Sequence, residues 1–123
     1  MRRLILATLL AAAPATAAPD LDRLLSGTVS GKAAHCIRPR DIRGQTIVNQ
    51  STIVFERGAR RYWRNDVGPN CAALRPDRAI VTREIAIGIC EGDPFEVVDT
   101  ISRVNFGSCT FGPFVPYERP RTR

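Results

Sequence analysis

The sequence predicts an all-β domain: a small antiparallel barrel or sandwich of six to seven short strands with at most short helical turns. Runs of β-branched and aromatic residues alternate with glycine, proline and asparagine turns, and no apolar pattern keeps a helical period over the length of a helix. Four cysteines indicate two disulfides. A chain of 123 residues has room for one such domain.

Residues 1–17 have the pattern of a signal peptide. Arg2 and Arg3 form a positive end, an apolar run follows over residues 4–13, and small residues at 15–17 suit cleavage after Ala17. The apolar run is about half the roughly 20 residues that span a bilayer. We therefore expect a periplasmic or secreted protein without a membrane span.

The segments on either side of the domain are expected to be loosely held. Residues 18–34 read as a flexible tether, in which Asp20 is placed to cap a short helical turn over residues 21–25. Residues 119–123 are basic and contain a proline, which indicates a disordered tail. The disulfide-stabilised β domain is therefore expected over residues 35–118.

The clearest strand signal is a hairpin. Residues 46–48 and 52–55 are rich in β-branched side chains, and the polar residues 49–51 between them indicate a bulge or a separate tight turn. Residues 56–59 supply a glycine-bearing turn, and residues 60–64 return as the second arm.

Further strands are predicted along the second half of the chain, at residues 79–82, 85–89, 95–98 and 104–111. A loop is expected at Gly68-Pro69-Asn70, and a helical turn over residues 71–74. Gly88 and Gly107 each stand two residues before a cysteine, where glycine permits a bulge or a close approach of two backbones.

The four cysteines favour two disulfides over a metal site. Export leads to an oxidising compartment, and no pair has the Cys-x-x-Cys spacing of a zinc site. Four cysteines allow three connectivities. We favour Cys36 with Cys109, which would join the opening and closing strands, and Cys71 with Cys90, which would pin a loop to the end of a strand.

Five short motifs occur in a fixed order: Cys36-Ile37, Arg60-Arg61-Tyr62, Asn70-Cys71-Ala72-Ala73-Leu74, Cys90-Glu91-Gly92-Asp93 and Cys109. In these motifs the chain resembles a family of small exported proteobacterial proteins, a domain of unknown function with four cysteines. The resemblance covers most of residues 35–118. It implies an exported domain with disulfides and carries over no catalytic residue.

The formal net charge of +6 is largely outside the domain. Arginines of the signal peptide and the tail account for most of it, so the bulk charge gives no support to binding of nucleic acid. Within the domain, residues 34–83 carry ten basic and four acidic side chains, and residues 84–118 carry one basic and six acidic. We expect the two halves to interleave and neutralise one another; the alternative is a dipolar binding surface.

The strongest candidate binding site is the second hairpin arm with its turn: Arg57, Arg60, Arg61, Tyr62, Trp63 and Arg64. Arginines beside aromatic rings bind anionic or ring-bearing polymers by ion pairing and stacking. Alternation places Tyr62 and Trp63 on opposite faces of the strand, and we expect that both faces cannot be dry. The structural alternative is that one ring is core and the other lies under arginine stems.

Other chemistries have less support. His35 is the only histidine, and the sequence has neither a Gly-x-Ser-x-Gly elbow nor a phosphate-binding glycine loop. The acidic run Glu91, Asp93, Glu96 and Asp99 offers carboxylates for a hydrolase or a weak calcium site, but alternating carboxylates on strands are usually solvated. We therefore expect no catalytic residue, no metal and no cofactor.

Together these features predict a noncatalytic binding module for an anionic envelope polymer or a periplasmic protein partner. The alternatives are a small inhibitor of a secreted hydrolase and a minor hydrolase that uses Glu96 or Asp99.

Overall fold

The computed structural model describes residues 8–11, 21–68, 71–83 and 88–121. Within these ranges the protein is all-β, with ten short strands in three antiparallel sheets, one turn of α-helix, α1 (Leu21–Leu24), and a 3-10 turn, η1 (Pro39–Asp41). The predicted fold class is confirmed. The sheets do not close into a barrel, and there are more strands than the predicted six to seven because several have only two residues.

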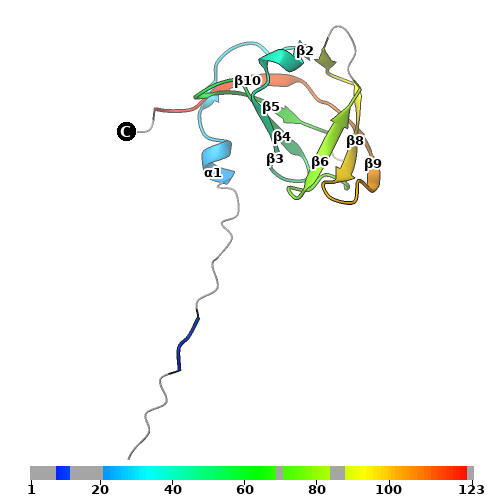
Figure 1. Cartoon of the computed structure of the whole chain (residues 1–123). Helices are drawn as coiled ribbons and strands as arrows, with labels where there is room; N and C mark the ends of the chain where they lie inside the picture. The colour runs from blue at the N-terminus through cyan, green and yellow to red at the C-terminus, as the bar shows by residue number, and fades with distance from the viewer. Residues whose placement is uncertain (1–7, 12–20, 69–70, 84–87, 122–123) are drawn as a thin grey trace, which may run out of the picture.

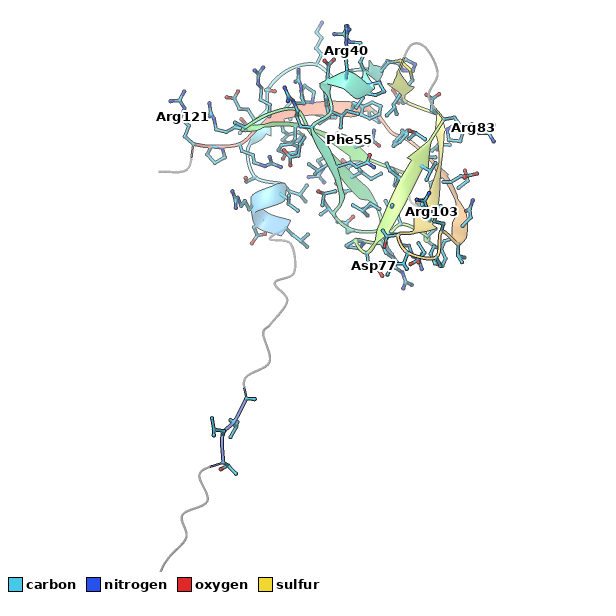
Figure 2. All side chains as sticks on the ribbon, in the orientation of Figure 1. Arg40, Phe55, Asp77, Arg83, Arg103 and Arg121 are labelled. Carbon is cyan, nitrogen blue, oxygen red and sulfur yellow. A yellow bond between two sulfur atoms is a disulfide. The ribbon has the colours of Figure 1, made fainter. Side chains whose placement is uncertain are left out.

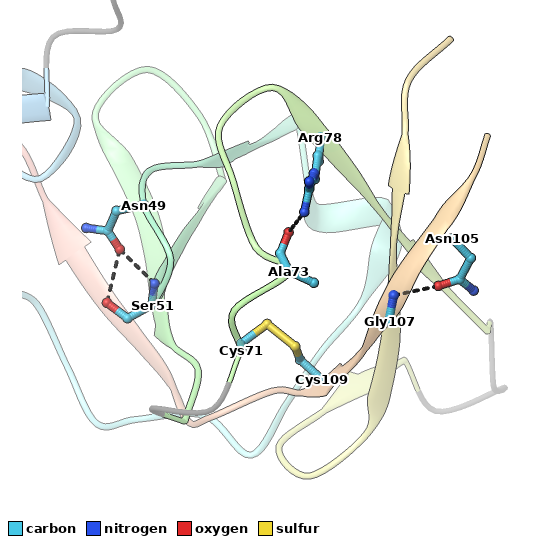
Figure 3. Close-up of a disulfide and its surroundings, with 8 residues drawn as sticks. All are labelled: Asn49, Ser51, Cys71, Ala73, Arg78, Asn105, Gly107 and Cys109. Carbon is cyan, nitrogen blue, oxygen red and sulfur yellow. Dashed lines mark hydrogen bonds between the residues drawn. A yellow bond between two sulfur atoms is a disulfide. The ribbon is translucent and has the colours of Figure 1, made fainter. Parts of the chain in front are cut away.

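The largest sheet has the strand order β1-β10-β5-β4-β3 (Figure 1). Its strands are β1 (Thr28–Val29), β3 (Gly44–Ile47), β4 (Thr52–Glu56), β5 (Arg61–Asp66) and β10 (Phe114–Glu118). The strands β3, β4 and β5 form the predicted hairpin region, in which Phe55 lies opposite Trp63. Residues 49–51 make a separate tight turn, where the Asn49 side chain accepts hydrogen bonds from the Ser51 backbone and hydroxyl at 2.8 and 3.0 Å (Figure 3).

Two smaller sheets complete the fold. One pairs β2 (Cys36–Ile37) with β7 (Ile89–Cys90), and the other has the order β6-β8-β9, with β6 (Arg78–Thr82), β8 (Pro94–Asp99) and β9 (Asn105–Thr110). The strands predicted at 79–82, 95–98 and 104–111 are confirmed within a few residues. Most of the strand predicted at 85–89, and most of the loop predicted at 68–70, lie outside the described residues.

The main core lies where the three sheets face one another. It contains fourteen buried residues drawn from all three sheets and their connections, among them Phe55, Trp63, Leu74, Phe95 and Phe114. Edge-on contacts, with ring centroids 5.9 and 5.6 Å apart, join Phe55 to Phe111 just after β9 and to Phe114 in β10 of the same sheet. Burial of this cluster is the principal favourable term in folding.

Strand β10 was not expected from the sequence, because Pro116 stands in its middle. Proline cannot donate to a β-ladder and normally argues against an internal strand. The carbonyl of Pro116 accepts a hydrogen bond from the Ser30 backbone at 2.9 Å, so its missing N–H also lies on the side of the short strand β1. The pairing of β10 with β5 therefore loses no hydrogen bond at this proline.

The expectation that the two faces of β5 cannot both be dry is wrong. Trp63 lies in the main core, while Tyr62 on the opposite face is buried in a second cluster with Val48 and Val54. Leu24 and Leu25 pack against that second cluster from the N-terminal segment. Both faces are covered because the segment expected to be free lies on the outer face of the sheet.

The prediction of a flexible tether at residues 18–34 therefore fails over most of its length. The predicted helical turn is present as α1, but Thr28 and Val29 pair with β10, and Ala34 forms a bridge to Phe114. Gly27 has φ of +104°, and an added Cβ there would collide with the Glu118 carbonyl oxygen. Only glycine lets the chain pass this close to the backbone of residue 118 as it enters β1.

The predicted disulfide pairing is also wrong, although all four cysteines are paired. The bonds join Cys36 to Cys90 and Cys71 to Cys109. Figure 3 shows the second of them. Cys36 and Cys90 lie directly opposite each other because β2 and β7 are neighbours. The predicted pairing assumed instead that Cys36 lay beside the strand that carries Cys109. Gly88 and Gly107 both have positive φ, and Gly88 lies against the Ile37 carbonyl, as predicted for a close backbone approach.

Gly27→Ala should lower the free energy of unfolding by about 2 kcal/mol or more, because alanine is strained at positive φ and its Cβ would meet the backbone of residue 118. Chemical denaturation measures the change, and limited proteolysis of residues 21–29 detects release of the segment. The matched control is Gly58→Ala, where the added Cβ meets nothing within 4 Å. Wild-type stability and protease resistance in the Gly27 variant would contradict the docking described.

Candidate functional site

A basic hollow of about 530 Å³ lies at the end of the large sheet where β4 turns into β5. One wall is the segment around η1 and the other is the hairpin turn. Six arginines line it: Arg38, Arg40, Arg43, Arg57, Arg60 and Arg61. The remaining lining residues are two carboxylates, Asp41 and Glu118, and the small residues Gly58 and Ala59. We call this site the basic hollow.

Backbone hydrogen bonds hold both walls in place. The Arg43 N–H donates to the Glu56 carbonyl at 2.7 Å, which ties the segment after η1 to the end of β4. The Arg57 N–H donates to the Arg61 carbonyl at 2.9 Å and closes the hairpin turn. The site is therefore built on strand ends and a short turn.

The arginine side chains are only partly neutralised. Arg38 pairs with Asp41 at 3.1 Å, and Arg60 pairs with Glu118 at 3.4 Å. Arg40, Arg43, Arg57 and Arg61 have no carboxylate partner among the residues that the structure describes. Strands from the two halves of the domain do lie side by side, but they leave an excess of positive charge at this end of the sheet.

Trp63 contributes to the site only through Arg57, which covers its ring. The Arg57 guanidinium carbon lies 4.1 Å from the centre of the Trp63 ring, and the ring is 7% exposed. This contact fixes Arg57 by a cation–π interaction, and it occupies the ring face that a ligand would need.

The structure brings together only part of the predicted binding set. Arg57, Arg60 and Arg61 line the basic hollow, whereas Tyr62 and Trp63 are buried. Arg64 lies farther along β5, opposite Val54, and donates to both carboxylate oxygens of Asp66 at 3.1 Å. The predicted combination of ion pairing with ring stacking is therefore not assembled at the surface.

Sequence reasoning missed three members of the site: Arg38, Arg40 and Arg43. They come from a segment some twenty residues before the hairpin arm, and the register that places Gly44 opposite Glu56 brings them near it. The cluster of three arginines within six residues was the available signal. Lys32 is the only lysine in the sequence, so the charge in this hollow is carried by guanidinium groups alone.

Beside the basic hollow, Arg119 is held in place by three groups. Its guanidinium donates to both carboxylate oxygens of Glu56 at 2.8 Å and to the Leu24 carbonyl at 2.9 Å, and lies 4.2 Å from the centre of the Tyr62 ring. The hydrogen bond to Glu56 raises the pKa of Arg119. The prediction of a disordered tail from residue 119 onward is therefore wrong at Arg119, whose side chain is 14% exposed.

Tyr62 joins the N-terminal segment to the sheet. Its hydroxyl donates to the Ser26 carbonyl at 2.9 Å, and its ring stacks on Tyr117 at 5.3 Å between centroids. Burial raises the pKa of Tyr62 above its ordinary value of 10.0.

Two of the four predicted carboxylates are used in turns. Asp93 accepts a hydrogen bond from the Cys90 backbone at 2.8 Å. Asp99 accepts one from the backbone and one from the hydroxyl of Ser102, and the backbone hydrogen bond from Ser102 lowers the pKa of Asp99. Glu91 lies 3.5 Å from His35 at the surface. The described part of the chain holds no group of three or more His, Cys, Asp or Glu side chains arranged to bind a metal ion.

Comparison with protein families, with curated proteins and with solved structures finds no match to this chain. The resemblance to a family of small exported proteins stays a prediction. Among the described residues, no helix is long and apolar enough to cross a membrane.

Stability should fall as the pH rises above 10. The unfolded chain loses the Tyr62 proton at its ordinary pKa of 10.0, while the buried hydroxyl keeps it to a higher pH, so alkali favours the unfolded state. Tyr62→Phe should cost about 1 kcal/mol at neutral pH through loss of the bond to Ser26 and should show a smaller alkaline decline. Denaturant unfolding at several pH values measures both effects; equal alkaline declines in the two proteins would contradict the assignment.

Proposed function

We propose that this protein is an exported binding module that holds an anionic component of the cell envelope in the basic hollow, without catalysing a reaction on it. The observation that carries the proposal is the set of four arginines, Arg40, Arg43, Arg57 and Arg61, which line one hollow without a carboxylate partner among the described residues. Guanidinium groups without carboxylate partners leave positive charge in the hollow, and this charge attracts an anion.

The exposure of the arginines sets the character of this binding. Arg40, Arg43 and Arg61 are exposed, so each ion pair with a ligand contributes roughly 0.2–1 kcal/mol and is weakened by salt. Useful affinity therefore requires a ligand that engages several guanidinium groups at once. A polymer or a multiply charged headgroup meets this requirement, whereas a single carboxylate does not.

The disulfides support the cellular setting of the proposal. Cys36–Cys90 and Cys71–Cys109 account for every cysteine, and such bonds persist in oxidising compartments outside the cytoplasm. Together with the predicted signal peptide, they favour an encounter with envelope components. Nucleic acid is not the expected ligand.

The triple variant Arg40→Ala, Arg43→Ala and Arg61→Ala should lose retention on immobilised dextran sulfate, by about tenfold or more at low salt, because three of the ligand's ion pairs are removed. Affinity chromatography with a salt gradient measures the loss, and neutral dextran controls for the matrix. These side chains are exposed, so the fold should persist, which circular dichroism checks.

The matched control removes equal charge elsewhere: Arg75→Ala, Arg83→Ala and Arg103→Asn. Asparagine is chosen at 103 because Arg103 has φ of 59°, which asparagine tolerates. In Figure 2, Arg40 lies at the top of the domain, and Arg103 lies in its lower right part. If the two triple variants lose retention equally, the binding reflects net charge and the basic hollow is not the site.

A further inference from the structure

The walls of the basic hollow restrict the kind of anion that it can recognise. Apart from six arginines and two carboxylates, the lining consists of Gly58 and Ala59. Sites that bind a sugar or a base by stacking present an exposed aromatic face. The aromatic residues next to the lining in sequence do not line it: Tyr62 is buried under Arg119 and stacks on Tyr117, and Trp63 is buried under Arg57. The described lining therefore offers charge and hydrogen-bond donors, and no flat apolar surface.

The arginines approach the hollow from two directions. Arg40 and Arg43 belong to the wall around η1, and Arg57 and Arg61 belong to the hairpin turn. The acceptor sites of a carboxylate lie in one plane, which limits the directions from which guanidinium forks can approach it. A phosphate group is tetrahedral and presents acceptor oxygens in several directions, which lets adjacent phosphates pair with both walls together.

The cation type agrees with this geometry. Every cationic side chain in the lining is an arginine, whose rigid fork of donors matches phosphate oxygens in a bidentate manner. A lysine ammonium would supply the same charge without the fork. The exposed arginines Arg43 and Arg61 can therefore be changed to lysine to separate fork recognition from charge.

Resting on the proposed function, we infer that the basic hollow takes clustered phosphate groups, presented by a soluble oligophosphate chain or by phosphomonoester lipid headgroups, and recognises them without reading a sugar ring or a base. The phosphates bridge the two arginine walls. Whatever ring or chain carries the phosphates stays outside the hollow.

Isothermal titration of the oxidised protein with tripolyphosphate, citrate and ATP at matched ionic strength tests this inference. Tripolyphosphate should bind about threefold to fivefold tighter than citrate, the gain expected from one further exposed ion pair. ATP should bind within about threefold of tripolyphosphate, because the adenine finds no ring to stack on. Citrate binding as tightly as tripolyphosphate, or ATP binding tenfold tighter, would overturn the inference.

The charge-preserving variant Arg43→Lys, Arg61→Lys provides a second, independent reading. It should weaken tripolyphosphate about tenfold while changing dextran sulfate retention much less, because the net charge is kept and two forks are lost. The matched control is Arg75→Lys, Arg83→Lys, which should behave as wild type. Unchanged tripolyphosphate affinity in the first variant would also overturn the inference.

Two further ligands identify the source of the phosphates. Long-chain polyphosphate in solution tests a free chain, and phosphatidylcholine vesicles with and without phosphatidic acid test a headgroup. Binding to either one supports the inference and names the source, and binding to neither overturns it. Retention on dextran sulfate without tripolyphosphate binding would leave the proposed function standing, whereas failure of both would remove it.

Discussion

The burial of strand β5 on both faces is the constraint on which the rest of the structure depends. Trp63 fills the main core, and Tyr62, its neighbour in sequence, fills a second cluster on the opposite face. A strand with large rings on both sides needs cover on both sides. The three-stranded sheet supplies part of one cover, and the N-terminal segment with Leu24 and Leu25 supplies the other. Both the three-stranded sheet and the N-terminal segment are therefore needed to bury β5.

This double burial also determines where the charge goes. Arginine guanidinium groups cannot be buried without partners. Those near the aromatic pair therefore either form an ion pair with a carboxylate or lie at the ends of the strands. Arg119 forms such an ion pair, with Glu56 accepting two hydrogen bonds from it. Arg57 and Arg61 lie at the end of the sheet, where they line the same hollow as the arginines around η1. The basic hollow is thus a consequence of how the aromatic residues pack.

Local sequence patterns predicted the features that depend on neighbouring residues, namely strand positions and glycine conformations. Strand composition located the hairpin, β6, β8 and β9, and the glycines before Cys90 and Cys109 predicted a bulge or a close backbone approach, which occurs at Gly88. Features set by long-range pairing were missed: strand β10 was hidden by Pro116, and the disulfide partners depend on β2 lying beside β7. The same holds for the site, where the hairpin arginines were found and those around η1 required the β3–β4 register.

The contact between the two ends of the described domain constrains the order of folding. Thr28 and Val29 pair with Tyr117 and Glu118, and the Leu24 carbonyl accepts a hydrogen bond from Arg119, 95 residues later. Such pairings raise contact order and slow the search for the native state. Residues 21–29 are synthesised well before strand β10, so they stay unfixed until that strand is in place. Tyr62 stays uncovered until then, which makes the interval before closure the period of greatest exposure to proteases and aggregation.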